Sequence, residues 1–183
     1  MGFLHTIKKR AGRYFLSRTK WKRKRKGSNF SQGQSVLVLY LDNGEDHYKK
    51  VKRYVQHLKE EYGMRDVLAL GYVDCVEKNL PFYQKHQLEI EFFSRTDLNW
   101  YCKPQGVVDK FLSKPYDILI DLVFEPSLPM EFVLAESQAG MKVGKHKTPG
   151  AEYCDIVLNI EGRDNVDEFL HQVDHYLSNF SFQ

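Results

Sequence analysis

The chain has 183 residues, with 27 basic and 24 acidic side chains, 42% hydrophobic residues and three cysteines. This length and composition fit one globular domain and exclude wholesale disorder. The longest apolar stretch covers residues 36–41, far short of the roughly 20 residues of a membrane-spanning helix. Because the N-terminus lacks a continuous apolar signal region and the cysteines form no C-x-x-C pair, we expect a cytoplasmic protein without a disulfide framework.

Short apolar runs alternate with amphipathic stretches along the chain, which is typical of an α/β domain with a mostly parallel sheet. Residues 35–42 are apolar on both faces and predict a strand covered by helices on both sides. Residues 45–62 carry apolar side chains every three or four positions and predict a helix that ends at Gly63. Residues 67–73 predict a second strand. The alternating run 88–93 predicts a half-exposed edge strand.

The second half of the chain continues this alternation. The predicted elements are a helix over 107–112, a central strand over 116–122, a helix between Ser127 and Gly140, strands over 141–144 and 155–159, and a final helix over 166–180 that Asp164 or Asn165 would cap. We therefore predict a single Rossmann-like three-layer α/β sandwich with a mostly parallel sheet over residues 30–183.

Residues 1–27 form a separate basic segment. They hold 11 of the 27 basic residues and no acid, so the other 16 basic residues face all 24 acids and the remainder has a net charge of −8. The apolar positions fall on one side of a helical wheel and predict a basic amphipathic helix. These positions are Phe3, Leu4, Ile7, Ala11, Tyr14, Phe15 and Trp21.

Three interpretations of this arm remain open. The apolar stripe packs on the acidic body while the cations form a solvated tail, the helix lies on an anionic membrane surface, or the arm over residues 1–26 binds nucleic acid or the ribosome. The last two interpretations place the protein at an anionic surface, with a location that is cytoplasmic or peripheral at the membrane. The candidate cations are Lys8, Lys9, Arg13, Lys20, Lys22, Arg23, Lys24, Arg25 and Lys26.

A second candidate site follows from the predicted sheet. In open parallel sheets ligands bind beyond the carboxyl ends of the strands, so the residues that follow each strand are the candidates for a small-molecule ligand. The loop after the third predicted strand adds a cation, an amide and an indole, which suit a ligand with a planar or anionic part. The six candidates are Asp42, Arg95, Asn99, Trp100, Asp121 and Lys145.

Other chemistry has weaker support in the sequence. Asp42, Asp74 and Asp121 have the side chains that Mg²⁺ prefers, but an aspartate after a strand is more often a helix cap or turn residue. His171 and His175 have the spacing of a ligand pair, without the zincin glutamate or an evident third ligand. No metal, cofactor or catalytic residue is therefore predicted, and the sequence leaves open whether the protein is an enzyme.

Three motifs carry a resemblance to a known family. Asp97-Leu-Asn-Trp100 with Lys103-Pro104, residues 116–122, and Lys142-Val-Gly144 resemble an uncharacterised bacterial family of small α/β proteins with a basic N-terminal segment. The resemblance covers nearly the whole chain and implies no activity.

A shorter likeness covers residues 117–144. This stretch is similar to a strand–helix–strand piece in the first domain of heptosyltransferase-like glycosyltransferases. Those enzymes bind the sugar-nucleotide donor with a second Rossmann-like domain. The residues after the arm are too few to form two such domains. The leading hypothesis is therefore a non-enzymatic binding module that docks to an anionic surface or partner through its arm. The alternative is an enzyme or sensor of a nucleotide- or phosphate-type ligand at the strand ends.

Overall fold

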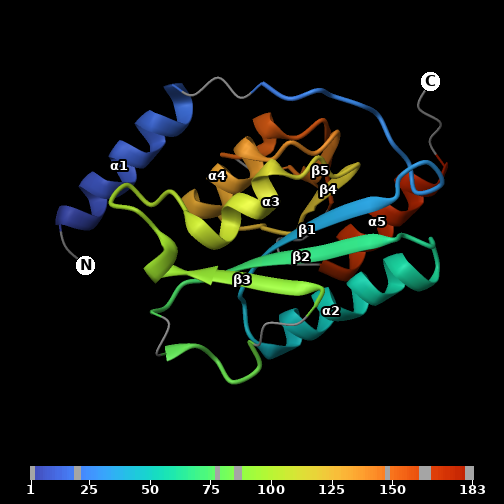
Figure 1. Cartoon of the computed structure of the whole chain (residues 1–183), viewed down its shortest axis with the longest axis horizontal. Coiled ribbons are helices and arrows are strands. Elements are labelled where there is room, and N and C mark those ends of the chain that lie inside the picture. Colours follow the sequence, from blue (N-terminus) through green and yellow to red (C-terminus); the bar gives the residue numbers. More distant parts are fainter. Residues whose placement is uncertain are drawn as a thin grey trace.

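The computed structural model describes residues 3–18, 22–76, 79–84, 88–146, 149–160 and 166–179. Six strands form one sheet in the order β3-β2-β1-β4-β5-β6, and every neighbouring pair is parallel (Figure 1). The strands are β1 (Ser35–Leu41), β2 (Asp66–Val73), β3 (Ile90–Ser94), β4 (Ile118–Asp121), β5 (Met141–Lys145) and β6 (Ile156–Leu158). This is the strand order of a doubly wound Rossmann-like sheet, so the predicted α/β class is confirmed.

Helices cover both faces of the sheet. The helices are α1 (Phe3–Arg18), α2 (Glu45–Glu60), α3 (Asp109–Ser113), α4 (Leu128–Glu136) and α5 (Val166–Asn179), with short 3-10 turns η2 (Arg95–Asp97), η3 (Gly106–Val108) and η4 (Ala151–Tyr153). Side chains alternate along a strand, so Val36 and Val38 of β1 face α2 and α5, while Leu37 and Leu39 face α3 and α4. The result is the predicted three-layer sandwich.

Several predicted elements differ in detail. The helix predicted between Ser127 and Gly140 ends earlier, at Glu136. The third strand lies at the edge of the sheet as predicted, but its half-exposed character was wrong, because Ile90, Phe92 and Phe93 are buried beneath the covering layers. The helix predicted over 107–112 is divided into η3 and α3. The proposed caps of the last helix lie outside the described residues.

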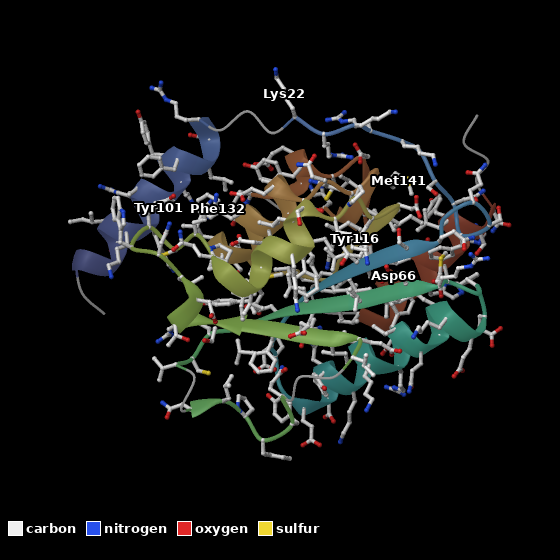
Figure 2. All side chains as sticks on the ribbon, in the orientation of Figure 1. Lys22, Asp66, Tyr101, Tyr116, Phe132 and Met141 are labelled. Atoms are coloured by element: carbon white, nitrogen blue, oxygen red, sulfur yellow. The ribbon has the colours of Figure 1, made fainter. Side chains whose placement is uncertain are left out.

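The arm is closely associated with the sandwich. Leu16 of α1 is buried against Leu128 and Phe132 of α4. Figure 2 shows Tyr101 and Phe132 between α1 and the sandwich, while Lys22 points away from it. Residues 22–30 then cross the molecule to the start of β1 (Figure 1). Across the described ranges, no helix combines the length and apolar character needed to span a membrane.

Candidate functional site

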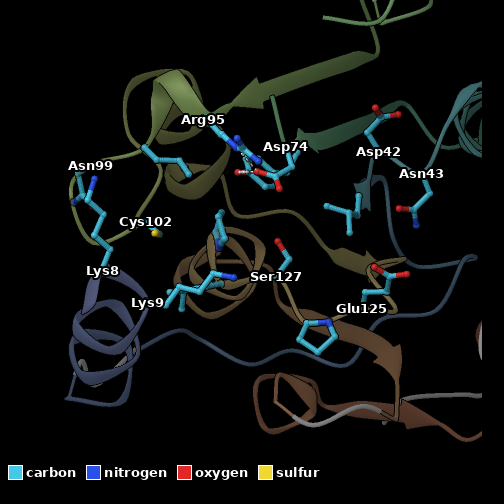
Figure 3. A pocket seen from close by; sticks show the side chains of 16 residues that line it. Lys8, Lys9, Asp42, Asn43, Asp74, Arg95, Asn99, Cys102, Glu125 and Ser127 are labelled. Carbon is cyan, nitrogen blue, oxygen red and sulfur yellow. Dashed lines mark hydrogen bonds and ion pairs between the residues drawn. The ribbon is translucent and has the colours of Figure 1, made fainter. Parts of the chain in front are cut away.

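A pocket of about 730 Å³ lies at the carboxyl ends of the strands (Figure 3). The chain runs outward from β1 to β3 on one side of the sheet and from β4 to β6 on the other. The pocket is therefore at the switch point between β1 and β4, where doubly wound folds bind ligands. Its lining comprises Lys8, Lys9, Leu41, Asp42, Asn43, Tyr72, Asp74, Arg95, Leu98, Asn99, Cys102, Glu125, Pro126, Ser127, Leu128 and Pro129.

Arg95 is held in one wall by an ion pair. Its Nε donates a hydrogen bond to Oδ1 of Asp74 at 2.6 Å, and the hydroxyl of Tyr72 donates to the same oxygen at 2.8 Å. The hydrogen bond from Arg95 lowers the pKa of Asp74 more than any other interaction with that carboxylate. Asp74 therefore stays ionised and keeps the Arg95 guanidinium at the end of β2.

Asp42 follows β1 and is fixed by donors from a different loop. Its Oδ1 accepts hydrogen bonds from the hydroxyl of Tyr83 and from Nε2 of Gln84, both at 3.1 Å. Gln84 is buried and also accepts a hydrogen bond from the hydroxyl of Tyr40. Burial and the nearby charge of Asp42 raise the pKa of Tyr83 to about 12. The phenol thus remains a donor at neutral pH, and Asp42 is oriented before any ligand arrives.

Asn99 organises the loop that closes one end of the pocket. Its Oδ1 accepts hydrogen bonds from the backbone N–H groups of Tyr101 and Lys103, at 3.1 and 3.0 Å. Cys102 in this loop has a φ of 68°, which is uncommon for a residue other than glycine. Burial raises the pKa of the Cys102 thiol. This favours the neutral thiol, so the environment does not activate Cys102 as a nucleophile.

Helix α1 supplies the wall opposite the strand ends. Lys8 and Lys9 line the pocket from its N-terminal half, and among the described residues neither has an acidic partner within ion-pair distance. Gly12 permits this position, because a Cβ there would lie 2.3 Å from the carbonyl oxygen of Tyr101. Arg13, one helical turn after Lys9, donates hydrogen bonds to both carboxylate oxygens of the buried Glu131, at 2.8 and 3.2 Å.

The N-terminus of α4 also faces the pocket. Ser127 is the residue before the helix, and its hydroxyl makes no capping hydrogen bond although the residue is only 8% exposed. Figure 3 shows Ser127 pointing between Lys9 and Glu125. The first N–H groups of a helix and its dipole favour an anion at this end. The start of α4, the Ser127 hydroxyl and Lys9 therefore face the same pocket, which Lys8 lines beside Asn99.

The structure brings three of the six predicted ligand residues together. Asp42, Arg95 and Asn99 line the pocket, whereas Trp100, Asp121 and Lys145 lie outside its lining. Each of these three has a structural contact. Trp100 packs edge-on against Phe15, with ring centroids 6.2 Å apart.

The other two are buried. Oδ1 of Asp121 accepts a hydrogen bond from the backbone N–H of Val123 at 3.0 Å. Asp121 is therefore a turn residue, which is the more common role of an aspartate after a strand. The Lys145 amine lies 4.8 Å from the centre of the Phe124 ring. Sequence reasoning missed Ser127 as a site residue, although it correctly predicted that a helix begins there. It also assigned Lys8 and Lys9 to an external surface only.

The remaining candidate cations of the arm divide into two groups. The Arg23 side chain is only 7% exposed, donates hydrogen bonds to the carbonyl oxygens of Ala139 and Gly140, and forms an ion pair with Asp155. Arg25 lies 3.4 Å from the same carboxylate but is otherwise exposed. Lys22, Lys24 and Lys26 are exposed. Lys20 and Trp21 lie outside the described residues. Within the described ranges, no cluster of three or more acidic, histidine or cysteine side chains is arranged to bind a metal.

Comparisons with known proteins identify a family without an assigned activity. Residues 8–180 match the model of the family of unknown function DUF6913. No curated protein and no solved structure matches the chain. The matched region begins at Lys8, so it includes most of α1 together with the sheet. The chain thus belongs to the DUF6913 family.

Proposed function

We propose that the protein binds a small phosphorylated, hydroxyl-bearing molecule in the pocket at the strand ends. The observation that carries this proposal is that three features line the same pocket: the α4 N-terminus at Ser127, which has no side-chain capping hydrogen bond, and Lys8 and Lys9, which make no ion pair with a described acid. Backbone N–H groups at a helix start bind phosphate well, and nearby lysines add charge. The volume of about 730 Å³ is in the usual range for a small-molecule site.

The rest of the pocket suits a hydroxylated moiety. Asp42, Asn43 and Glu125 lie together on the side away from Lys8 (Figure 3). Carboxylates and amides at this position accept hydrogen bonds from hydroxyl groups. Because Tyr83 and Gln84 already orient Asp42, little side-chain entropy is lost when a ligand binds. The proposed ligand therefore places its phosphate near Lys9 and its hydroxyl groups near Asp42.

Isothermal titration of the full-length protein tests this proposal. We take inorganic phosphate, ribose 5-phosphate and unphosphorylated ribose as probes. Ribose 5-phosphate is expected to bind most tightly, and Lys9→Met is expected to weaken it by about tenfold or more, because a charge-assisted hydrogen bond is lost. Ser127→Ala is expected to weaken it by a smaller factor.

The matched control is Lys22→Met, which removes an exposed cation from the same arm at a distance from the pocket. It is expected to leave the affinity unchanged. Equal affinity for ribose and ribose 5-phosphate contradicts the proposal. Equal losses in Lys9→Met and Lys22→Met also contradict it, since they indicate a general effect of charge.

A second proposed function is docking of the arm on an anionic surface. It is favoured by the exposed cations that make no ion pair with described acids, namely Arg10, Arg18, Lys22, Lys24 and Lys26. No acidic residue occurs in the chain before Asp42. Retention on an anionic matrix such as heparin tests this function. Replacement of Lys22, Lys24 and Lys26 by Gln is expected to lower the eluting salt concentration markedly, and an unchanged elution contradicts docking by charge.

A further inference from the structure

The apolar side of α1 faces outward. Ile7 is 43% exposed, Tyr14 55% and Phe15 40%, whereas the contact with α4 is made by Gly12, whose Cβ position lies against Leu128, and by Leu16. Ordinarily the apolar face of a surface helix packs on the core. Here Ile7, Tyr14 and Phe15 instead keep about half of their surface exposed in the described structure.

A second element extends this outward surface. Trp100 is 58% exposed, comes from the loop after η2, and packs edge-to-face on Phe15. Phe15 also contacts Tyr14 at 5.8 Å and Tyr101 at 4.7 Å between ring centroids. We call Ile7, Tyr14, Phe15 and Trp100 the outer patch. The patch is therefore formed by two segments that are far apart in the sequence, and the contact between Phe15 and Trp100 joins them.

Cations surround the outer patch. Arg10 and Arg18 are exposed on α1, and the Arg18 guanidinium carbon lies 5.1 Å from the centre of the Tyr14 ring. The exposed residues Lys22, Lys24 and Lys26 continue the positive charge beyond the helix. Apolar side chains among positive charges, with Tyr and Trp at the margin, match the headgroup boundary of an anionic lipid bilayer.

We propose that the outer patch inserts into the interfacial region of an anionic lipid bilayer. This inference rests on the proposed docking of the arm and names its partner. A bilayer is favoured over nucleic acid because the rings pack edge-to-face on one another and the patch includes the exposed aliphatic Ile7, on a helix at the margin of the molecule (Figure 1). Single-stranded nucleic acid instead needs separated ring faces in a groove.

Trp100 provides a direct reporter of insertion. In a Trp21→Phe background it is the only remaining tryptophan, because the chain has two. Full-length protein is mixed with phosphatidylcholine vesicles that contain or lack phosphatidylserine. We expect binding only to the anionic vesicles, a blue shift of Trp100 emission, and quenching by lipids brominated near the headgroup.

Two sets of variants separate insertion from charge. Ile7→Ser with Tyr14→Ser is expected to lower vesicle binding by about tenfold at moderate salt, while heparin retention is unchanged. Ser17→Ala is the matched control on an exposed position of the same helix. Lys22→Gln with Lys24→Gln is expected to lower both vesicle and heparin binding.

The outcomes distinguish failure of insertion from failure of docking. Binding to anionic vesicles without a Trp100 shift, and without any effect of the double serine variant, overturns insertion and leaves docking by charge intact. Binding to a single-stranded oligonucleotide but not to vesicles overturns the lipid assignment in favour of nucleic acid. Absence of binding to vesicles, heparin and oligonucleotide overturns both proposals.

Discussion

Helix α1 and the segment 22–30 share a basic composition but are attached to the sandwich in different ways. The segment is held by backbone hydrogen bonds, from Lys26 to Gly140 and from Phe30 to Leu177, and by the hydrogen bonds of the Arg23 side chain. Helix α1 is held on one side, and its opposite side is exposed. The same charge thus serves two structural roles: in the segment it secures the chain, and in α1 it lines a pocket and an outer surface.

Because of this difference, a deletion of the whole arm would have several structural effects at the same time. Removing residues 1–26 removes the contacts of Arg23, the α1 wall of the pocket and the α1 part of the outer patch at once. Single substitutions are needed to separate them.

The largest expected effect concerns Lys142, which lies beneath the segment. Its amine donates to the carbonyl oxygens of Leu134 and Ala135 at the end of α4, and burial followed by the charge of Arg23 lowers its pKa to about 7. The unfolded chain keeps this proton up to about pH 10. Because the unfolded state binds more protons between these values, the free energy of unfolding rises with pH there, by about 4 kcal/mol.

Urea denaturation of the wild type and Lys142→Met between pH 7 and about pH 10 measures this effect. The difference in the free energy of unfolding between the two proteins is expected to change steadily across the range. Parallel profiles would mean that Lys142 is solvated and that the segment does not seal it.

Gly12→Ala tests the close contact of α1. Alanine favours a helix by about 1 kcal/mol over glycine, but its Cβ would lie 2.3 Å from the Tyr101 carbonyl oxygen and 2.7 Å from Cδ2 of Leu128. We expect a net loss of about 2 kcal/mol in the free energy of unfolding, because the helix must move away. Ser17→Ala on the exposed side is the control, and a stabilised Gly12→Ala protein contradicts the contact.

Arg13→Met tests the polar part of the same contact. The change leaves Glu131 buried without the two hydrogen bonds that Arg13 donates to it. We expect a loss of about 1 kcal/mol, which is modest because Arg13 is half exposed. Thermal unfolding of Arg13→Met and of the exposed Arg10→Met gives the comparison. Equal melting temperatures for the two variants argue against a structural role for Arg13.

The smallest expected effect is on the outer side. Tyr14→Ser changes a side chain that is 55% exposed, so the free energy of unfolding is expected to change by no more than about 0.5 kcal/mol. Chemical denaturation measures this value. A loss as large as that of Gly12→Ala would show that the outer side is covered by another part of the chain.

The fold follows largely from periodicity in the sequence. The apolar run 35–42 and the alternation of strands with amphipathic stretches predict a covered parallel sheet, because strand and helix periods differ. Strand order was beyond sequence reasoning, since it depends on contacts between distant segments.

Half of the predicted ligand residues lie at the pocket for the expected reason, since Asp42, Arg95 and Asn99 follow strands that end at one edge. The roles of Lys8 and Lys9 were missed because a helical wheel defines the sides of a helix without saying which side meets the body. The apolar stripe indicated one side, but Gly12, which has no side chain, allows the other side to approach.

The most direct test of the central claim is hydrogen–deuterium exchange of the full-length protein with and without saturating ribose 5-phosphate. The claim is that α1, the strand-end loops and the start of α4 form one binding site. We expect slower exchange on binding in three places together: the first half of α1, residues 95–102 and residues 127–131. Protection of the strand ends with unchanged exchange in α1 would contradict it.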